Sequence, residues 1–137
     1  MVAEGVRGVR VCRGMQEDSD ALPKSGSTAR TLGVSPSGQF GDIIVTVGDY
    51  VFPGTGGMSV SPWPPENIEE HRRSEEFGGT GKDPVWEIDT EDLPRELRYQ
   101  PDPEKPDVHG YIAPARWMSL SEYQRVLHGT RTLWVRV

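Results

Sequence analysis

The chain has 137 residues, 34% of them hydrophobic, and its 15 basic and 21 acidic side chains give a formal net charge of −6. This length matches one domain and excludes two ordinary domains with separate cores. The negative charge excludes unspecific nucleic-acid binding, because it repels phosphate backbones. No apolar run approaches the roughly 18 residues of a membrane helix, so we expect no membrane partner. The sequence predicts one domain over residues 1–137.

The short apolar clusters, separated by glycines and prolines, predict a strand-rich domain without long helices. A first strand is expected to end at about Arg13, with Gly14 as its exit. Residues 16–41 are polar and rich in Ser, Gly and Pro. Since this segment lacks periodic apolar positions, we expect a surface excursion that contributes little to the core.

The middle of the chain predicts three further strands. Apolar runs at 43–47 and 50–52 are separated by the turn pair Gly48-Asp49. The bend at 53–57 carries three glycines and is followed by an extended run at 58–60. A bend this rich in glycine leaves room for a ligand.

Residues 66–77 have the composition of a short exposed helix that follows a proline. Its basic triplet 71–73 is bracketed by glutamates, which is typical of a solvated helical face. Strands are predicted at 85–88 and 108–113, with a proline-rich loop at 100–106 between them.

The clearest helix signal lies near the C-terminus. Ser119 and Glu122 have the spacing of a capping box, and apolar residues through 127 then recur on one helical face. Gly129 is placed to end this helix, and residues 132–137 predict a final strand.

The potential metal ligands have no metal-binding spacing. Cys12, His71, His109 and His128 are the only cysteine and histidines, and no CxxC or HxxxH pair occurs among them. We therefore expect no metal site. A cysteine nucleophile with His109 as its base stays open, although a lone cysteine in a strand is typical of buried packing.

Two features bear on the compartment. The lone Cys12 forms no internal disulfide, and residues 1–14 are charged and lack the apolar core of a secretory signal. We expect a cytoplasmic protein. Export by a secretion system that needs no such signal stays open.

Three short motifs carry a resemblance to mono-ADP-ribosyltransferases. They read Val-Cys-Arg-Gly at 11–14, Thr-Gly-Gly-Met-Ser-Val at 55–60 and Val-His-Gly-Tyr-Ile-Ala-Pro-Ala at 108–115. Their order and spacing resemble the family's strand that ends in arginine, its serine strand and its late strand with the catalytic acid. Here His109 stands where the family has glutamate.

More closely, the chain resembles the Tse-two type of type VI secretion effector toxin. This bacterial family implies an α+β, ADP-ribosyltransferase-like fold with two small, mostly antiparallel sheets and a few short helices. It also implies action in the target-cell cytoplasm and a cognate immunity (antitoxin) protein. The chain departs from the family at Met58, where the family has threonine, and at 16–41, which has no clear counterpart.

The resemblance implies a cleft that holds NAD as a substrate for ADP-ribose transfer to an unknown target. It assigns catalytic roles to Arg13, Ser59 and His109. Arg13 can grip phosphate or ribose in a forked contact, and Ser59 can bond the ribose. A neutral His109 can accept a hydrogen bond from the ribose hydroxyl, although it stabilises positive charge less well than a carboxylate does. The implied NAD-contacting residues are Arg13, Gly56, Gly57, Met58 and Ser59.

Two other classes of protein stay open. A toxin can keep this fold and act by binding a protein target without any transfer, which the missing glutamate favours. An ordinary intracellular interaction domain is the second. Singly, Arg13, Ser59 and His109 are also typical of a surface ion pair, a turn cap and a hydrogen-bonded strand histidine.

Overall fold

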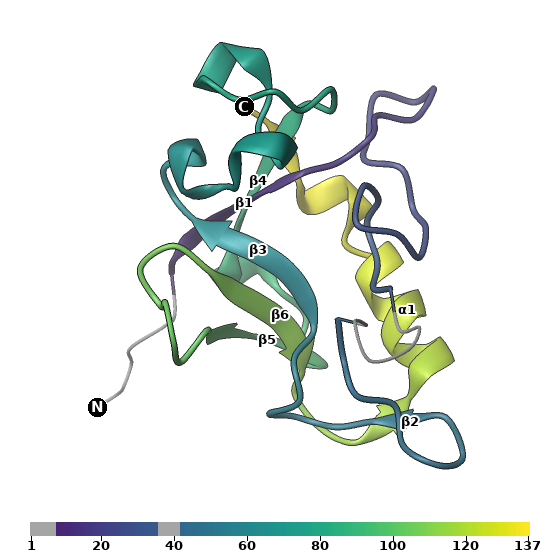
Figure 1. Ribbon diagram of the computed structural model, residues 1–137. Helices are drawn as coiled ribbons and strands as arrows, with labels where there is room; N and C mark the ends of the chain where they lie inside the picture. The colour runs from purple at the N-terminus through teal and green to yellow at the C-terminus, as the bar shows by residue number, and fades with distance from the viewer. Residues whose placement is uncertain (1–7, 36–41) are drawn as a thin grey trace.

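The computed structural model describes residues 8–35 and 42–137. Six strands form the larger sheet in the order β5-β6-β3-β1-β4-β8, and every neighbouring pair is antiparallel (Figure 1). A second antiparallel sheet consists of β2 and β7. The expected α+β class with two antiparallel sheets is thereby confirmed. The larger sheet comprises β1 (Arg10–Gly14), β3 (Met58–Pro62), β4 (Val85–Asp89), β5 (Leu97–Pro101), β6 (Gly110–Pro114) and β8 (Val135–Arg136), and the smaller β2 (Tyr50–Val51) and β7 (Met118–Ser119).

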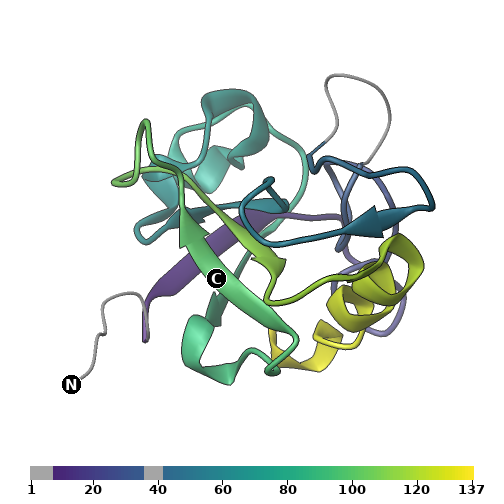
Figure 2. The same cartoon turned by 90° about the horizontal axis from the view of Figure 1, so that it is seen from below.

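The C-terminal helix α1 (Leu120–His128) forms where the capping box predicts it. The Ser119 hydroxyl accepts a hydrogen bond from the Glu122 amide at 3.1 Å, and Gly129 follows the last turn. The helix and β2 lie side by side beyond one end of the larger sheet (Figures 1 and 2). No helix in the described part of the chain is long and apolar enough to cross a membrane.

The predicted helix over 66–77 is wrong. The segment contains three separate 3₁₀ turns, whose hydrogen bonds join each residue to the third one before it. Only Ile68 among these residues is a buried apolar side chain, so the segment has no stripe that would hold a regular helix against the core. The 3₁₀ turns of the described chain are Pro65–Asn67, Glu70–Arg72, Glu75–Phe77, Thr90–Asp92 and Arg131–Leu133.

Two other predicted elements differ. Residues 43–47 form no strand: Ile43 makes an isolated bridge to Gly56. The strand β3 that follows Gly56 already has β6 and β1 as its two neighbours, so the larger sheet has no free edge there. The proline-rich loop predicted at 100–106 begins inside β5, which pairs along its whole length with β6. Pro101 is tolerated there because β5 is an edge strand.

The expectation that 16–41 contributes little to the core is also wrong for its described part, 16–35. Leu32 and Val34 are completely buried in the main hydrophobic cluster. The Gln124 side chain of α1 forks onto Val34, accepting from its amide at 3.0 Å and donating to its carbonyl at 2.9 Å. Two apolar residues without periodicity thus anchor an irregular segment, which a search for periodic patterns misses. Residues 36–41 lie outside the described residues.

We expect slow hydrogen exchange in this segment. The amides of Gln16, Lys24 and Leu32 donate to main-chain carbonyls at 2.8–2.9 Å. We expect them to exchange at least about a hundredfold more slowly than unprotected amides, the factor that an opening free energy of about 3 kcal/mol gives. The fully exposed Val47 is the internal reference. Equal rates, measured by NMR after transfer to D₂O, would show that 16–35 is not anchored.

Candidate functional site

A cavity of about 360 Å³ opens beside β1 and β3, and Arg13, Ser59 and His109 all line it. Its other walls come from the turns at 67–72 and the loop that precedes β6. The structure therefore brings together three residues that lie far apart in the sequence. The complete lining is Cys12, Arg13, Gly14, Ala29, Asp42, Ser59, Val60, Ser61, Asn67, Ile68, Glu69, Arg72, Lys105, Val108 and His109.

Strand alternation explains why β3 presents serines to the cavity. Side chains of a strand point alternately to its two faces. Met58 and Val60 belong to the main hydrophobic cluster, so Ser59 and Ser61 take the other face. Ser61 is paired with Cys12 of β1, which also lines the cavity. The alternation of apolar and polar residues in Met-Ser-Val-Ser is thus the local signal for this wall.

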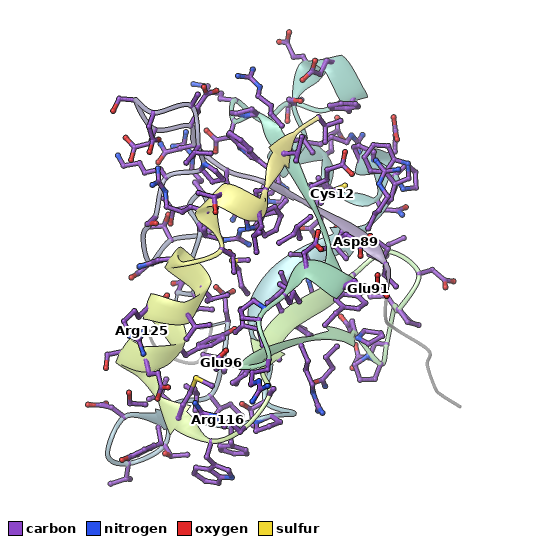
Figure 3. The ribbon with its side chains drawn as sticks, turned by 180° about the vertical axis from the view of Figure 1, so that it is seen from behind. Cys12, Asp89, Glu91, Glu96, Arg116 and Arg125 are labelled. Atoms are coloured by element: carbon purple, nitrogen blue, oxygen red, sulfur yellow. The ribbon has the colours of Figure 1, made fainter. Side chains whose placement is uncertain are left out.

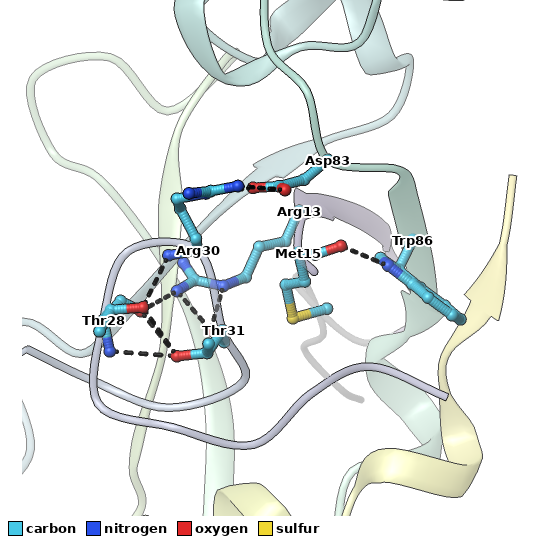
Figure 4. Close-up of polar contacts among 7 residues, drawn as sticks. All are labelled: Arg13, Met15, Thr28, Arg30, Thr31, Asp83 and Trp86. Carbon is cyan, nitrogen blue, oxygen red and sulfur yellow. Dashed lines mark hydrogen bonds and ion pairs between the residues drawn. The ribbon is translucent and has the colours of Figure 1, made fainter. Parts of the chain in front are cut away.

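The Arg13 side chain donates its hydrogen bonds to the protein's own main chain. Its side chain is 6% exposed, and its guanidinium donates to the carbonyls of Thr31 at 2.8 Å and Ser59 at 2.7 Å (Figure 4 draws the Thr31 contacts). Longer bonds reach Thr28 and Gly33. Burial lowers the pKa of Arg13 to about 10, which leaves it protonated at neutral pH. Four of its five N–H groups are engaged, so a forked grip on phosphate is not available to it.

His109 is held by a carboxylate that the sequence reasoning missed. Its Nδ1 lies 2.8 Å from Oδ2 of Asp102, and both side chains are largely buried, with exposures of 23% and 11%. The Asp102 amide also donates to the His109 carbonyl at 3.0 Å. The pKa of Asp102 is lowered, first by the hydrogen bond from the Glu104 amide and to a smaller extent by the one from His109. The carboxylate is therefore ionised and accepts, which makes Nδ1 the donor and leaves Nε2 as the basic nitrogen.

A hairpin explains this pair. Asp102 directly follows β5, and His109 directly precedes β6, so antiparallel pairing places the two ends of the loop opposite each other. His109 thus lies just before the strand and not within it, which corrects its predicted place in a strand over 108–113. The available signal was an acid and an imidazole at the two ends of one short proline-rich loop.

Gly56, Gly57 and Met58, which are expected to contact NAD, do not line this cavity. Met58 is completely buried, and its sulfur accepts from the Gly33 amide. A Cβ on Gly57 would lie 2.6 Å from the Ile112 carbonyl oxygen. Gly56 has a φ of +102° and abuts the Asp42 carbonyl. At these two glycines the absence of a side chain allows the protein's own backbone segments to pack closely.

Arg72 and Lys105 supply the cavity's other positive charges. They come from two different segments, and no hydrogen bond or ion pair of either side chain is found among the described residues. Asp42 and Glu69 are the acidic lining residues. The Asp42 carboxylate accepts from the Ser35 amide at 2.8 Å. Arg72 therefore belongs to a cavity wall, in contrast to the solvated helical face predicted for 71–73.

We expect Cys12 to be unreactive despite its place in the cavity wall. Burial, with Glu87 nearby, raises the pKa of its thiol from 9.0 to about 12. Only the thiolate is nucleophilic, so alkylation by iodoacetamide at pH 8 should be on the order of a hundredfold or more slower in the folded protein than in urea. Mass spectrometry of timed samples measures this. Fast labelling of the folded protein would revive Cys12 as a nucleophile.

No group of three or more histidine, cysteine or carboxylate side chains suited to a metal ion occurs within 8–35 and 42–137. Comparison of the chain with protein-family models, curated proteins and solved structures finds no match. The fold and the cavity thus define the chain as an α+β protein with two antiparallel sheets and an oriented histidine in the wall of a cavity.

Proposed function

We propose that the chain is a bacterial toxin domain that binds NAD in this cavity and transfers ADP-ribose to a target in the cytoplasm of another cell. The observation that carries the proposal is the meeting of Arg13, Ser59 and His109 at one cavity. The sequence resemblance alone points to these three residues, which lie far apart in the chain. Their convergence is what a functional site requires, and three unrelated surface residues would be expected to scatter.

The residues of the cavity fit NAD if Arg13 is not a phosphate-binding residue. A volume of about 360 Å³ lies at the small end of ligand sites, so the cavity would take one half of the dinucleotide. Arg72 and Lys105 would meet the phosphates, since the guanidinium of Arg13 is engaged by carbonyls. Ser59 would bond the ribose. Arg13 would act as a positioning residue that holds the wall on which Ser59 lies.

His109 would face the ribose that undergoes transfer. In the family a glutamate accepts a hydrogen bond from a ribose hydroxyl; here Ser59 would bond the ribose, which leaves Nε2 of His109 free. Asp102 adds a negative charge behind the ring, so the pair together compensates part of the positive charge that develops on the sugar. Asp102 and His109 together would in this way take the place of the family's catalytic glutamate.

Binding and turnover of NAD test the proposal. Isothermal titration should detect NAD binding to the purified protein, and Arg72→Ala with Lys105→Ala should weaken it by about tenfold or more, the factor for about 1.4 kcal/mol. The exposed Lys82, which does not line the cavity, gives the control Lys82→Ala. Nicotinamide release should accompany binding. A protein that neither binds NAD nor releases nicotinamide, in the presence of bacterial lysate as a source of targets, is not a transferase.

A toxin that acts by binding alone is the second candidate, and the smaller sheet favours it. Val51 and Met118 point to the core, so Tyr50, Phe52 and Trp117 face outward. The rings of Phe52 and Trp117 stack with centroids 4.5 Å apart, and Trp117 is 59% exposed. The exposed Arg116, labelled in Figure 3, directly precedes Trp117 in the chain. Exposed aromatic residues and arginine are enriched where proteins bind proteins.

Trp117→Ser separates the two candidates. This change removes the exposed ring and leaves the cavity untouched. Growth inhibition in a bacterium without the cognate immunity protein should persist in Trp117→Ser if transfer at the cavity is the toxic activity. Loss of inhibition in this variant, with NAD turnover intact, would move the function to the aromatic face.

A further inference from the structure

We propose that the group that receives ADP-ribose is an O–H, either a hydroxyl of the target or water, and that His109 Nε2 is the base that takes its proton. This inference rests on the proposed transferase function. Asp102 is the positioning residue of the pair, since it acts only through His109. The observation behind the proposal is the 2.8 Å contact between Asp102 Oδ2 and His109 Nδ1 at a cavity wall.

The contact decides which ring nitrogen is basic. An ionised Asp102 can only accept, so in the neutral ring Nδ1 carries the proton and Nε2 carries the lone pair. Asp102 does not line the cavity, whereas His109 does, so the carboxylate lies behind the ring. The main chain locks the same geometry, because the Asp102 amide donates to the His109 carbonyl and the His109 amide donates to the Lys105 carbonyl at 3.1 Å. The ring is therefore oriented before any ligand arrives.

A positioned base with this tautomer suits an O–H acceptor. Hydroxyl groups and water are weak nucleophiles until they lose a proton, whereas carboxylates and thiolates are already ionised when they attack. Among the described residues, His109 is the only histidine that lines this cavity, and Cys12 is held as a neutral thiol. A site built for an anionic acceptor would gain nothing from a base oriented in this way.

The reaction balances with these groups. The bond between C1 of the ribose and the nicotinamide nitrogen breaks, and nicotinamide leaves as a neutral ring with that electron pair. A new bond forms between the same carbon and the acceptor oxygen. The acceptor proton moves to His109 Nε2, and the resulting imidazolium is stabilised by Asp102 until the proton passes to solvent.

The first test reads the tautomer without any substrate. In ligand-free protein, at a pH at which the ring is neutral, ¹⁵N NMR should show His109 protonated at Nδ1 and free at Nε2. Asp102→Asn should shift the population towards the other tautomer, since an amide can donate to Nδ1. The matched control is Asp107→Asn, an exposed aspartate of the same loop, which should leave the spectrum of His109 unchanged. An unchanged His109 spectrum in Asp102→Asn would overturn the positioning role.

The second test identifies the acceptor. With NAD alone, release of free ADP-ribose reports water as acceptor; with labelled NAD and bacterial lysate, mass spectrometry locates the modified residue. A hydroxyl linkage should resist hydroxylamine, and Asp102→Asn should lower kcat by about 100- to 10,000-fold with little change in KM. Modification of arginine, cysteine or a carboxylate would overturn the inference while the transferase proposal stands. Absence of both NAD binding and nicotinamide release would instead overturn the transferase proposal, and with it this inference.

Discussion

Arg13→Ala is expected to lower the free energy of unfolding by about 3–5 kcal/mol, the largest loss that we expect from any single polar residue of the cavity. The guanidinium joins β1 to β3 through Ser59 and to the irregular segment through Thr31. Its removal leaves buried carbonyls without donors, and each such group costs about 1–3 kcal/mol. Arg13→Lys should lower the free energy of unfolding by less, because the ammonium keeps the positive charge. Some loss remains, because an ammonium cannot reach several carbonyls in one plane.

Urea unfolding followed by circular dichroism measures this loss. Arg30→Lys is the matched control, since Arg30 makes a forked contact with Asp83 at the surface (Figure 4) and should change stability by at most about 1 kcal/mol. Equal midpoints for Arg13→Ala and the parent would mean that the arginine does not brace the domain. If the loss is found, reduced toxicity of Arg13 variants reports folding as well as chemistry, and cannot by itself assign a catalytic role.

His109→Ala is expected to abolish growth inhibition and to slow nicotinamide release by about 100- to 1,000-fold. That range is typical for the loss of one polar group that acts in the transition state. The variant should stay folded, because Asp102 keeps its hydrogen bond from the Glu104 amide, and a loss of about 1–3 kcal/mol is small against the stability of a domain. Ser59→Ala should act in the same direction. Its main-chain contact with Arg13 is kept, so it removes only the hydroxyl.

His71→Ala is the control for these variants. His71 is an exposed histidine next to Arg72 in the sequence, and unlike Arg72 it does not line the cavity. Expression levels should match the parent, and all three variants should be folded under the assay conditions, before toxicity is compared. If His109→Ala and Ser59→Ala inhibit growth as well as the parent at equal expression, the cavity is not the functional surface. The aromatic face of Tyr50, Phe52 and Trp117 would then become the leading candidate.

Local patterns sufficed where neighbouring residues decide the structure. The capping box at Ser119 and the apolar stripe predict α1, because both signals act within a few turns of one helix. The strand that ends at Gly14 and the alternation in β3 are likewise visible in the sequence. Selection of Arg13, Ser59 and His109 needed the resemblance in addition, since each residue alone is also typical of ordinary surface and strand positions.

What lies between distant segments was decided only by the tertiary structure. Leu32 and Val34 are buried in the main hydrophobic cluster, and residues 16–35 have no periodic apolar pattern that would predict this. Arg13 became a brace because several distant carbonyls converge on its guanidinium. Asp102 became the partner of His109 because two strands pair in one register. Hydrogen bonds and packing depend on distance in space, whereas sequence patterns report only distance along the chain.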